Sequence, residues 1–132
     1  MIDLRDDIIL ANNVRKNAYV KHNKYSVGAV LMTKNGKRYT GCNVQNHGIM
    51  SICAERTAFC KAISEGERDF ERIVVIGGPE GQEPEKCLPC GYCRQFISEF
   101  VDKDFKIYTV FDNKVQEYTL EELLPHSFSL DI

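Results

Sequence analysis

Three of the six cysteines constrain the fold more than any other feature, because they are spaced as ligands of one metal ion. Cys90 and Cys93 lie at the start of an expected helix, and their spacing places both sulfurs on one helical face. Cys53 opens another expected helix and supplies a third thiolate. Three protein ligands leave the fourth position of a zinc ion open for water, as in catalytic rather than structural sites. The fold must therefore bring the starts of two helices together.

The other cysteines leave one alternative open. Cys87 could join the group and form a closed, four-thiolate structural zinc site. Such a site would give no purpose to Glu55, which lies two residues after Cys53 and is not needed as a ligand. We expect Cys42 and Cys60 to be buried as small hydrophobic residues, because free cysteine is usually buried.

Length and charge exclude several classes of protein. A chain of 132 residues suits one domain, and we expect residues 1–132 to form a single unit with its own core. The net charge of -2, with basic and acidic residues interleaved, argues against the basic stripe of a nucleic-acid-binding protein. An acidic N-terminal segment and the lack of a long apolar run predict a cytoplasmic protein without a signal peptide or membrane span.

Local patterns predict a helix, a hairpin and a second helix in the first half of the chain. An Asn-Gly turn separates two β-branched runs, residues 25–33 and 38–44, which predicts an antiparallel hairpin. Good helix formers fill residues 52–65, and Gly66 is placed as a C-terminal cap. Before the hairpin, apolar residues at helical spacing predict an amphipathic first helix: Leu4, Ile8, Ala11, Val14 and Ala18.

The second half alternates strands and helices. A strand over residues 72–76 precedes a helix that begins after Gly91, and a strand over residues 106–111 follows. A turn leads to a last strand over residues 115–118, and residues 119–122 have capping-box spacing for a short helix. Because strand–helix–strand connections are right-handed crossovers, we expect the later strands to lie parallel to one another and to join the hairpin. The predicted fold class is α/β, a three-layer α/β/α sandwich with a mixed five-stranded sheet.

Charged residues surround the predicted metal site. Three thiolates outweigh the two positive charges of zinc, and this excess opposes ionisation of a water on the metal. Arg56 and Arg94, which directly follow Glu55 and Cys93, are candidates to offset it together with the N-termini of the two helices. Glu55 lies close to the metal without being needed as a ligand, so it can carry protons.

Five ordered motifs give the chain a resemblance to a known family. A glutamate paired with a Pro-Cys-x-x-Cys run is part of the signature of zinc deaminases. The chain resembles the small cytidine deaminase family in its three-cysteine form, over nearly its whole length. The motifs that carry the resemblance are Val27-Gly28-Ala29, Gly41-Cys42-Asn43-Val44, residues 52–58 (Ile-Cys-Ala-Glu-Arg-Thr-Ala), residues 89–95 (Pro-Cys-Gly-Tyr-Cys-Arg-Gln) and Glu122-Leu123-Leu124-Pro125.

The resemblance implies an activity and a cofactor. The activity is the hydrolytic deamination of free cytidine and deoxycytidine to uridine and deoxyuridine, with release of ammonia, in pyrimidine salvage. The cofactor is one Zn²⁺ per subunit on Cys53, Cys90 and Cys93, with Glu55 as the catalytic proton carrier.

The resemblance also implies the residues of a substrate pocket. Asn43 and Gln45 would recognise the ribose, Tyr25 would stack on the base, and Ala54 would contact the substrate. Phe128 matches a C-terminal aromatic residue that reaches the site of a neighbouring subunit. Family members with this pattern are homotetramers, so we expect a homotetramer. Its binding partner would be a small nucleoside.

Several pocket positions depart from the family pattern. Gln45 stands where the family has Glu, and a neutral amide holds a hydroxyl less strongly than a carboxylate, by roughly 1 kcal/mol. Tyr25 replaces the usual Phe, His22-Asn23 replace Tyr-Ser, and the segment 46–52 is one residue shorter. A modified cytosine nucleoside of the blasticidin type is therefore an alternative substrate. A non-catalytic, zinc-stabilised interaction module is the alternative of another class.

Overall fold

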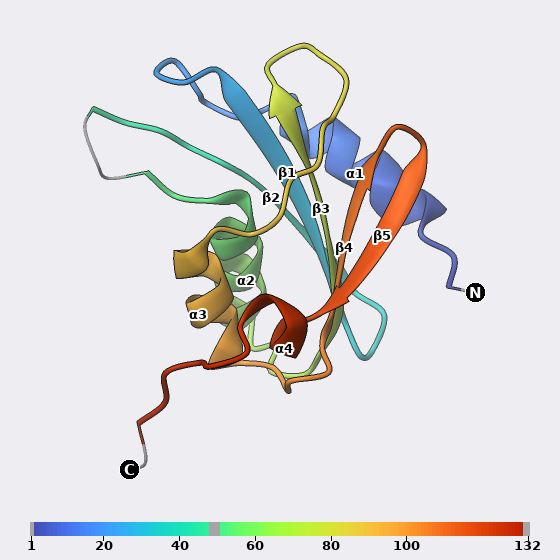
Figure 1. The fold of residues 1–132 in the computed structure, drawn as a ribbon, viewed down its shortest axis with the longest axis vertical. Helices are drawn as coiled ribbons and strands as arrows, with labels where there is room; N and C mark the ends of the chain where they lie inside the picture. Colours follow the sequence, from blue (N-terminus) through green and yellow to red (C-terminus); the bar gives the residue numbers. More distant parts are fainter. Residues whose placement is uncertain (1, 48–50, 131–132) are drawn as a thin grey trace.

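One mixed sheet forms the centre of the computed structural model, which describes residues 2–47 and 51–130 (Figure 1). Its strands lie in the order β2-β1-β3-β4-β5. The strands β3 and β4 are parallel, and every other neighbouring pair is antiparallel. The predicted five-stranded mixed sheet is therefore confirmed. The strands are β1 (Tyr25–Thr33), β2 (Arg38–Cys42), β3 (Phe70–Pro79), β4 (Lys106–Phe111) and β5 (Lys114–Thr119).

The direction of the last strand differs from our expectation. We expected the later strands to be parallel, and this is wrong for β5, which pairs with β4 in antiparallel register. Only Asp112 and Asn113 connect the two strands, and both have positive φ angles, of 51° and 57°. A two-residue connection can join only antiparallel strands, whereas parallel strands need a long crossover.

Helices cover both faces of the sheet, which confirms the three-layer α/β/α sandwich (Figure 1). On one face α1 (Arg5–Arg15) packs against β1 and β3, with Ala11 beside Val30 and Val74 in one buried cluster. The other face carries α2 (Ala54–Ser64), α3 (Gly91–Ser98) and α4 (Leu120–Leu123) over a larger buried cluster that includes Leu31, Phe59, Ile73 and Ile107. Within the described residues, no helix is long and apolar enough to cross a membrane.

Two glycines extend β3 beyond its predicted end. We expected the strand to end at Ile76, but it continues through Gly77 and Gly78 to Pro79. The two glycines leave room for neighbours: a Cβ on Gly77 would lie 2.7 Å from the Sγ of Cys87, and one on Gly78 would lie 3.1 Å from a guanidinium nitrogen of Arg15. The glycines therefore mark close packing rather than a chain break.

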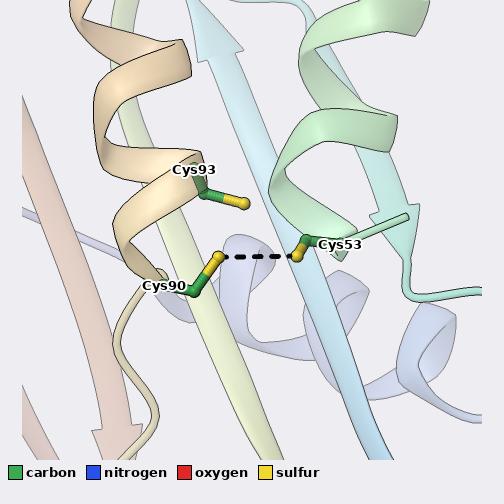
Figure 2. A group of neighbouring side chains, drawn as sticks. All are labelled: Cys53, Cys90 and Cys93. Atoms are coloured by element: carbon green, nitrogen blue, oxygen red, sulfur yellow. Dashed lines mark hydrogen bonds between the residues drawn. The ribbon is translucent and has the colours of Figure 1, made fainter. Parts of the chain in front are cut away.

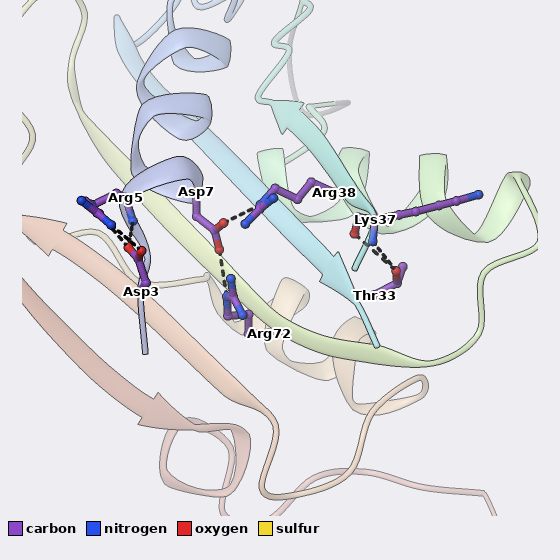
Figure 3. A network of polar contacts seen from close by, with 7 residues as sticks. All are labelled: Asp3, Arg5, Asp7, Thr33, Lys37, Arg38 and Arg72. Atoms are coloured by element: carbon purple, nitrogen blue, oxygen red, sulfur yellow. Dashed lines mark hydrogen bonds and ion pairs between the residues drawn. The ribbon is translucent and has the colours of Figure 1, made fainter. Parts of the chain in front are cut away.

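The interior beneath α1 contains charge as well as apolar side chains. Asp7 is fully buried, and its carboxylate accepts hydrogen bonds from the Nε atoms of Arg38 (2.6 Å) and Arg72 (2.9 Å), as Figure 3 shows. These contacts tie α1 to β2 and β3. Hydrophobic periodicity predicted α1, but it identified only the apolar residues of the buried face and not Asp7.

Candidate active site

The three predicted ligand cysteines meet where two helices begin (Figure 2). Cys53 is the N-cap residue of α2 and Cys90 that of α3, and both have the extended backbone typical of this position. Cys93 follows in the first turn of α3 and is buried. Helix N-termini carry partial positive charge and stabilise thiolates, so the backbone already favours the anionic form of these side chains.

The spacing of the sulfurs fits a zinc ion. All three Sγ atoms lie within 4.8 Å of one another, and those of Cys53 and Cys90 are 3.7 Å apart. Tetrahedral zinc with Zn–S bonds of about 2.3 Å separates two sulfurs by about 3.8 Å. Cys87 is not part of this group, so within the described residues the four-thiolate site is not formed. The three sulfurs that do meet would leave one coordination position of a tetrahedral zinc ion open.

The thiols shift one another's pKa values because they lie close together. A hydrogen bond from Cys93, together with Arg56 and opposed by burial, lowers the pKa of the Cys53 thiol to about 5. The same hydrogen bond, and burial, raise the pKa of Cys93 above its ordinary value. Three thiolates at this spacing repel one another, so a cation is needed to hold all three in the ionised form.

Arg56 supplies positive charge at the edge of the cluster. Its Nη2 atom lies 3.7 Å from the Sγ of Cys53 and donates to the carbonyl of Ser51 at 3.1 Å. The ring of Tyr92 stacks on the guanidinium, with 4.2 Å between the guanidinium carbon and the ring centroid. Because Tyr92 lies between the two α3 ligands in sequence, the same helix turn places both the sulfurs and this contact.

Glu55 lies next to the cluster in the first turn of α2. Only 4% of its surface is exposed. Burial, with a smaller contribution from the charge of Cys53, raises the pKa of Glu55 to about 7. A carboxyl group with a pKa near neutrality can both accept and donate a proton at physiological pH.

Tyr25 belongs to a cluster that the sequence did not predict. Its hydroxyl donates to a carboxylate oxygen of Glu85 at 3.4 Å, and Cys87 lies near enough to influence its pKa. Burial and these neighbours raise the pKa of the Tyr25 phenol above its ordinary value. Burial also raises the pKa of Cys87, to about 12, with a further contribution from the charge of Glu55. Glu85 and Tyr25 thus meet although 60 residues of sequence separate them.

The predicted ribose residues lie on the segment after β2. The side-chain amide of Asn43 accepts from the backbone N–H of Val27 and donates to the carbonyl of Tyr25, each at 2.9 Å. Gln45 is buried, and its Oε1 accepts from the backbone N–H of Asn23 at 3.3 Å. Both amides therefore fix the backbone near the start of β1, beside Tyr25.

A family model now adds to this geometry. The model described as the cytidine and deoxycytidylate deaminase zinc-binding region matches residues 5–109. The chain belongs to this deaminase family. It is therefore an enzyme of a zinc-dependent deaminase family, and its Cys53, Cys90 and Cys93 cluster is consistent with one zinc ion.

Individual relatives agree with the family. The cytidine deaminase of Sporosarcina psychrophila is 40% identical over 130 residues, covering 97% of this chain and 93% of that protein. The blasticidin-S deaminase of Bacillus cereus is 32% identical over 112 residues, covering 81% and 79% of the two chains. The crystal structure of cytidine deaminase from Burkholderia pseudomallei has a TM-score of 0.85 at 32% identity, covering 96% of this chain and all of that one.

Two further predicted residues of the deaminase lie along α3 and the C-terminal tail. The guanidinium of Arg94 donates to the carbonyls of Pro89 (2.6 Å) and Leu123 (2.9 Å), and its role in balancing charge at the metal stays a prediction. Phe128 is 66% exposed. The side chain of Gln95 holds its backbone at two points, accepting from its N–H at 3.0 Å and donating to its carbonyl at 2.8 Å.

Other predicted positions have mixed outcomes. Ala54, the first residue of α2, is fully buried next to Glu55. Our expectation that Cys60 is buried is wrong, because its side chain is exposed on α2, and Cys42 is only partly buried. The shortened segment 46–52 includes residues 48–50, which lie outside the described residues.

Some residues that contact the predicted site residues were missed by sequence reasoning. Glu85 contacts Tyr25, and Tyr92 contacts Arg56. Gln95 anchors the C-terminal tail. Tyr92 and Gln95 lie inside the Pro89–Gln95 motif, so their position was a usable signal. Glu85 lies in a loop of ordinary polar composition, which carries no such signal.

Proposed function

We propose that this chain hydrolyses free cytidine and deoxycytidine to uridine and deoxyuridine, with release of ammonia. One observation carries the proposal: three cysteine sulfurs converge at zinc spacing beside a buried glutamate. The relatives named cytidine deaminases support the substrate.

Cys53, Cys90 and Cys93 would hold the zinc ion as thiolates. When bound, zinc with three protein ligands supplies a Lewis acid that lowers the pKa of a water molecule in its fourth position. Arg56, 3.7 Å from the sulfur of Cys53, would offset the negative charge of the ligand set. Arg94 would add a second, more distant positive charge.

Glu55 would move the protons of the reaction. It would accept a proton from the attacking water and deliver it to the ring nitrogen beside the carbon under attack. The hydroxyl now bound to that carbon would give its proton through the same carboxylate to the exocyclic amine. The C–N bond then breaks, the amine leaves as ammonia, and the carbon keeps the oxygen of the water as a carbonyl. A pKa of about 7 suits a group that must accept and donate in turn.

The pocket residues would orient the nucleoside. The ring of Tyr25 would pack against the base, Ala54 would line the pocket beside Glu55, and Asn43 and Gln45 would bind the ribose. Gln45 in place of a carboxylate would weaken ribose binding. Phe128 would complete the pocket of a neighbouring subunit in a homotetramer, since its ring is exposed while its backbone is held.

The wider setting follows from the same proposal. A single domain over residues 1–132 would act on a small nucleoside in pyrimidine salvage in the cytoplasm. The net charge of -2 supports a nucleoside rather than a nucleic acid as the partner.

Ultraviolet absorbance of purified, zinc-loaded protein with cytidine and deoxycytidine tests the activity. The matched variant is Glu55→Gln, which keeps the size of the side chain. We expect the variant to retain one zinc per chain and to lose turnover by several orders of magnitude, because the proton carrier is gone. A wild-type protein that holds zinc but converts no cytosine compound would instead support a non-catalytic, zinc-stabilised module.

A modified cytosine nucleoside is the second candidate substrate. Three observations favour it: the similarity to the blasticidin-S deaminase of Bacillus cereus, the amide of Gln45, and the carboxylate of Glu85 beside the hydroxyl of Tyr25. A substrate panel separates the candidates by kcat/KM. A strong preference for blasticidin S over cytidine would make the modified nucleoside the main substrate.

A further inference from the structure

Arg15 makes an unusual set of contacts at the end of α1. It is buried, with 8% of its surface exposed. Its guanidinium donates to the carbonyls of Ser26 (3.0 Å), Gln82 (3.0 Å) and Pro79 (2.9 Å). All three acceptors are main-chain carbonyls, and no carboxylate of the described residues forms an ion pair with it. One side chain therefore joins the start of β1, the end of β3 and the loop after β3.

Two glycines make room for this contact. A Cβ on Gly28 of β1 would lie 2.2 Å from the carbonyl of Ala11 and 3.0 Å from the Cβ of Arg15. A Cβ on Gly78 of β3 would lie 3.1 Å from Nη2 of Arg15 and 3.0 Å from the carbonyl of Glu83. The strand β1 thus lacks a side chain where α1 crosses it, and β3 lacks one where the guanidinium and the loop cross it. The close approach of α1 and the loop depends on this feature of two separate strands.

The loop held by Arg15 leads directly to Tyr25, which the proposed function places in the wall of the nucleoside pocket. The backbone N–H of Glu85 donates to the carbonyl of Gly77 at 2.9 Å, which folds the loop back on β3. The side chain of Glu85 then meets the hydroxyl of Tyr25, with 3.4 Å between the two oxygens. Tyr25 itself precedes Ser26, whose carbonyl accepts from Arg15. Arg15 therefore holds both segments that meet at Tyr25, namely the start of β1 and the loop after β3.

We propose that Arg15 is a positioning residue for the nucleoside pocket, which it shapes by fixing the start of β1 and the loop 79–85 without touching substrate. The inference rests on the proposed function, since that function makes Tyr25 a wall of the pocket. The planar guanidinium suits the role because its several N–H groups point to three carbonyls in fixed directions. The ammonium group of lysine has no such fork and cannot span the same acceptors.

The variant Arg15→Met tests the proposal, because it keeps a long side chain and removes the hydrogen bonds. We expect the KM for cytidine to rise roughly tenfold or more while kcat changes by no more than about threefold, since binding surfaces move and the chemical groups do not. Arg15→Lys should give an intermediate KM. Zinc content should stay at one ion per chain in both variants.

Hydrogen exchange gives a readout that needs no substrate. The backbone N–H groups of Glu80, Gln82 and Glu85 are bonded to Lys24, Pro79 and Gly77. In Arg15→Met these amides should exchange about tenfold faster or more, because the loop opens locally. The matched control is Arg68→Met: Arg68 is exposed and also donates only to carbonyls, those of Ile63 and Glu67, and it should change neither KM nor the exchange of the loop.

Each outcome decides the proposal. Unchanged KM and unchanged loop exchange in Arg15→Met would overturn it, and so would a loss of kcat that simply follows a loss of zinc. If Arg15→Met does not fold, Arg15→Lys decides by the same two measurements, because it retains the charge and most of the packing. A wild-type protein without turnover would refute the proposed function, and the exchange data would still decide whether Arg15 holds the loop.

Discussion

Removal of the buried carboxylate of Asp7 should strongly destabilise the fold. Asp7 lies on α1, and none of its surface is exposed. Arg38 and Arg72 both donate to it (Figure 3). They differ in their access to water: 8% of the Arg72 side chain is exposed and 29% of the Arg38 side chain. In Asp7→Ala, Arg38 can turn towards solvent, but Arg72 keeps a buried charge without its partner.

The magnitude follows from this difference. Breaking a buried ion pair by removing one partner costs about 3–5 kcal/mol, because the remaining charge is left uncompensated. Since Arg38 can recover part of its hydration, we expect Asp7→Ala to lower the free energy of unfolding by about 3 kcal/mol, near the lower end of that range. Replacing both partners, as in Asp7→Leu with Arg72→Met, should cost less than the single change because no buried charge remains unpaired.

Urea unfolding followed by circular dichroism measures the effect, at one fixed protein concentration because association would add to stability. With a slope of about 1.5 kcal/mol per molar urea, the midpoint of Asp7→Ala should fall by about 2 M. The control is Asp6→Ala on the same helix turn, where the side chain is exposed and the change should stay within about 0.5 kcal/mol. A loss below about 1 kcal/mol in Asp7→Ala, or a double variant less stable than the single one, would refute the reasoning.

Three further predictions follow from other contacts. Gln95→Leu, which removes both bonds that hold the C-terminal tail, should raise the KM for cytidine while zinc content stays unchanged, measured by steady-state kinetics and metal analysis. Tyr92→Leu should speed the loss of zinc to a chelator by about two- to fivefold, because a cation–π contact of about 0.5–1 kcal/mol no longer holds Arg56 near the ligands; an unchanged rate would remove that role. The hydrogen bond from Tyr108 lowers the pKa of Glu117 from its ordinary value. The stability that Glu117 contributes is therefore present above the pKa of the unfolded chain and is lost as the pH falls through the lower pKa of the folded protein. The gap in urea midpoint between wild type and Glu117→Gln should accordingly shrink on acidification.

The parts of the fold that the sequence predicted correctly depend on local signals. The Asn-Gly turn lies between β1 and β2, with Gly36 at a φ of 90°, and the capping box of Thr119 and Glu122 starts α4. Each of these signals involves neighbours within a few residues, so a linear sequence contains all that is needed to identify them. For Gly77 and Gly78 the local signal wrongly predicted the end of a strand. The residues that fill the space beside these glycines come from α1 and from the loop before α3, so no local pattern reveals them.

The same distinction explains why the chemistry of the site was easier to predict than its substrate. The proposed ligands and the proposed proton carrier lie at the first turns of two helices, so short motifs around Cys53 and Cys90 predict their positions. The pocket wall has no comparable motif, since Tyr25 meets Glu85 across 60 residues of sequence and Arg15 reaches Gln82 across 67. A substitution in that loop can reshape the pocket while every motif of the deaminase stays intact. Specificity within this fold can therefore change through residues that resemble ordinary surface loop, and a substrate panel on loop variants would be more informative about specificity than one on motif variants.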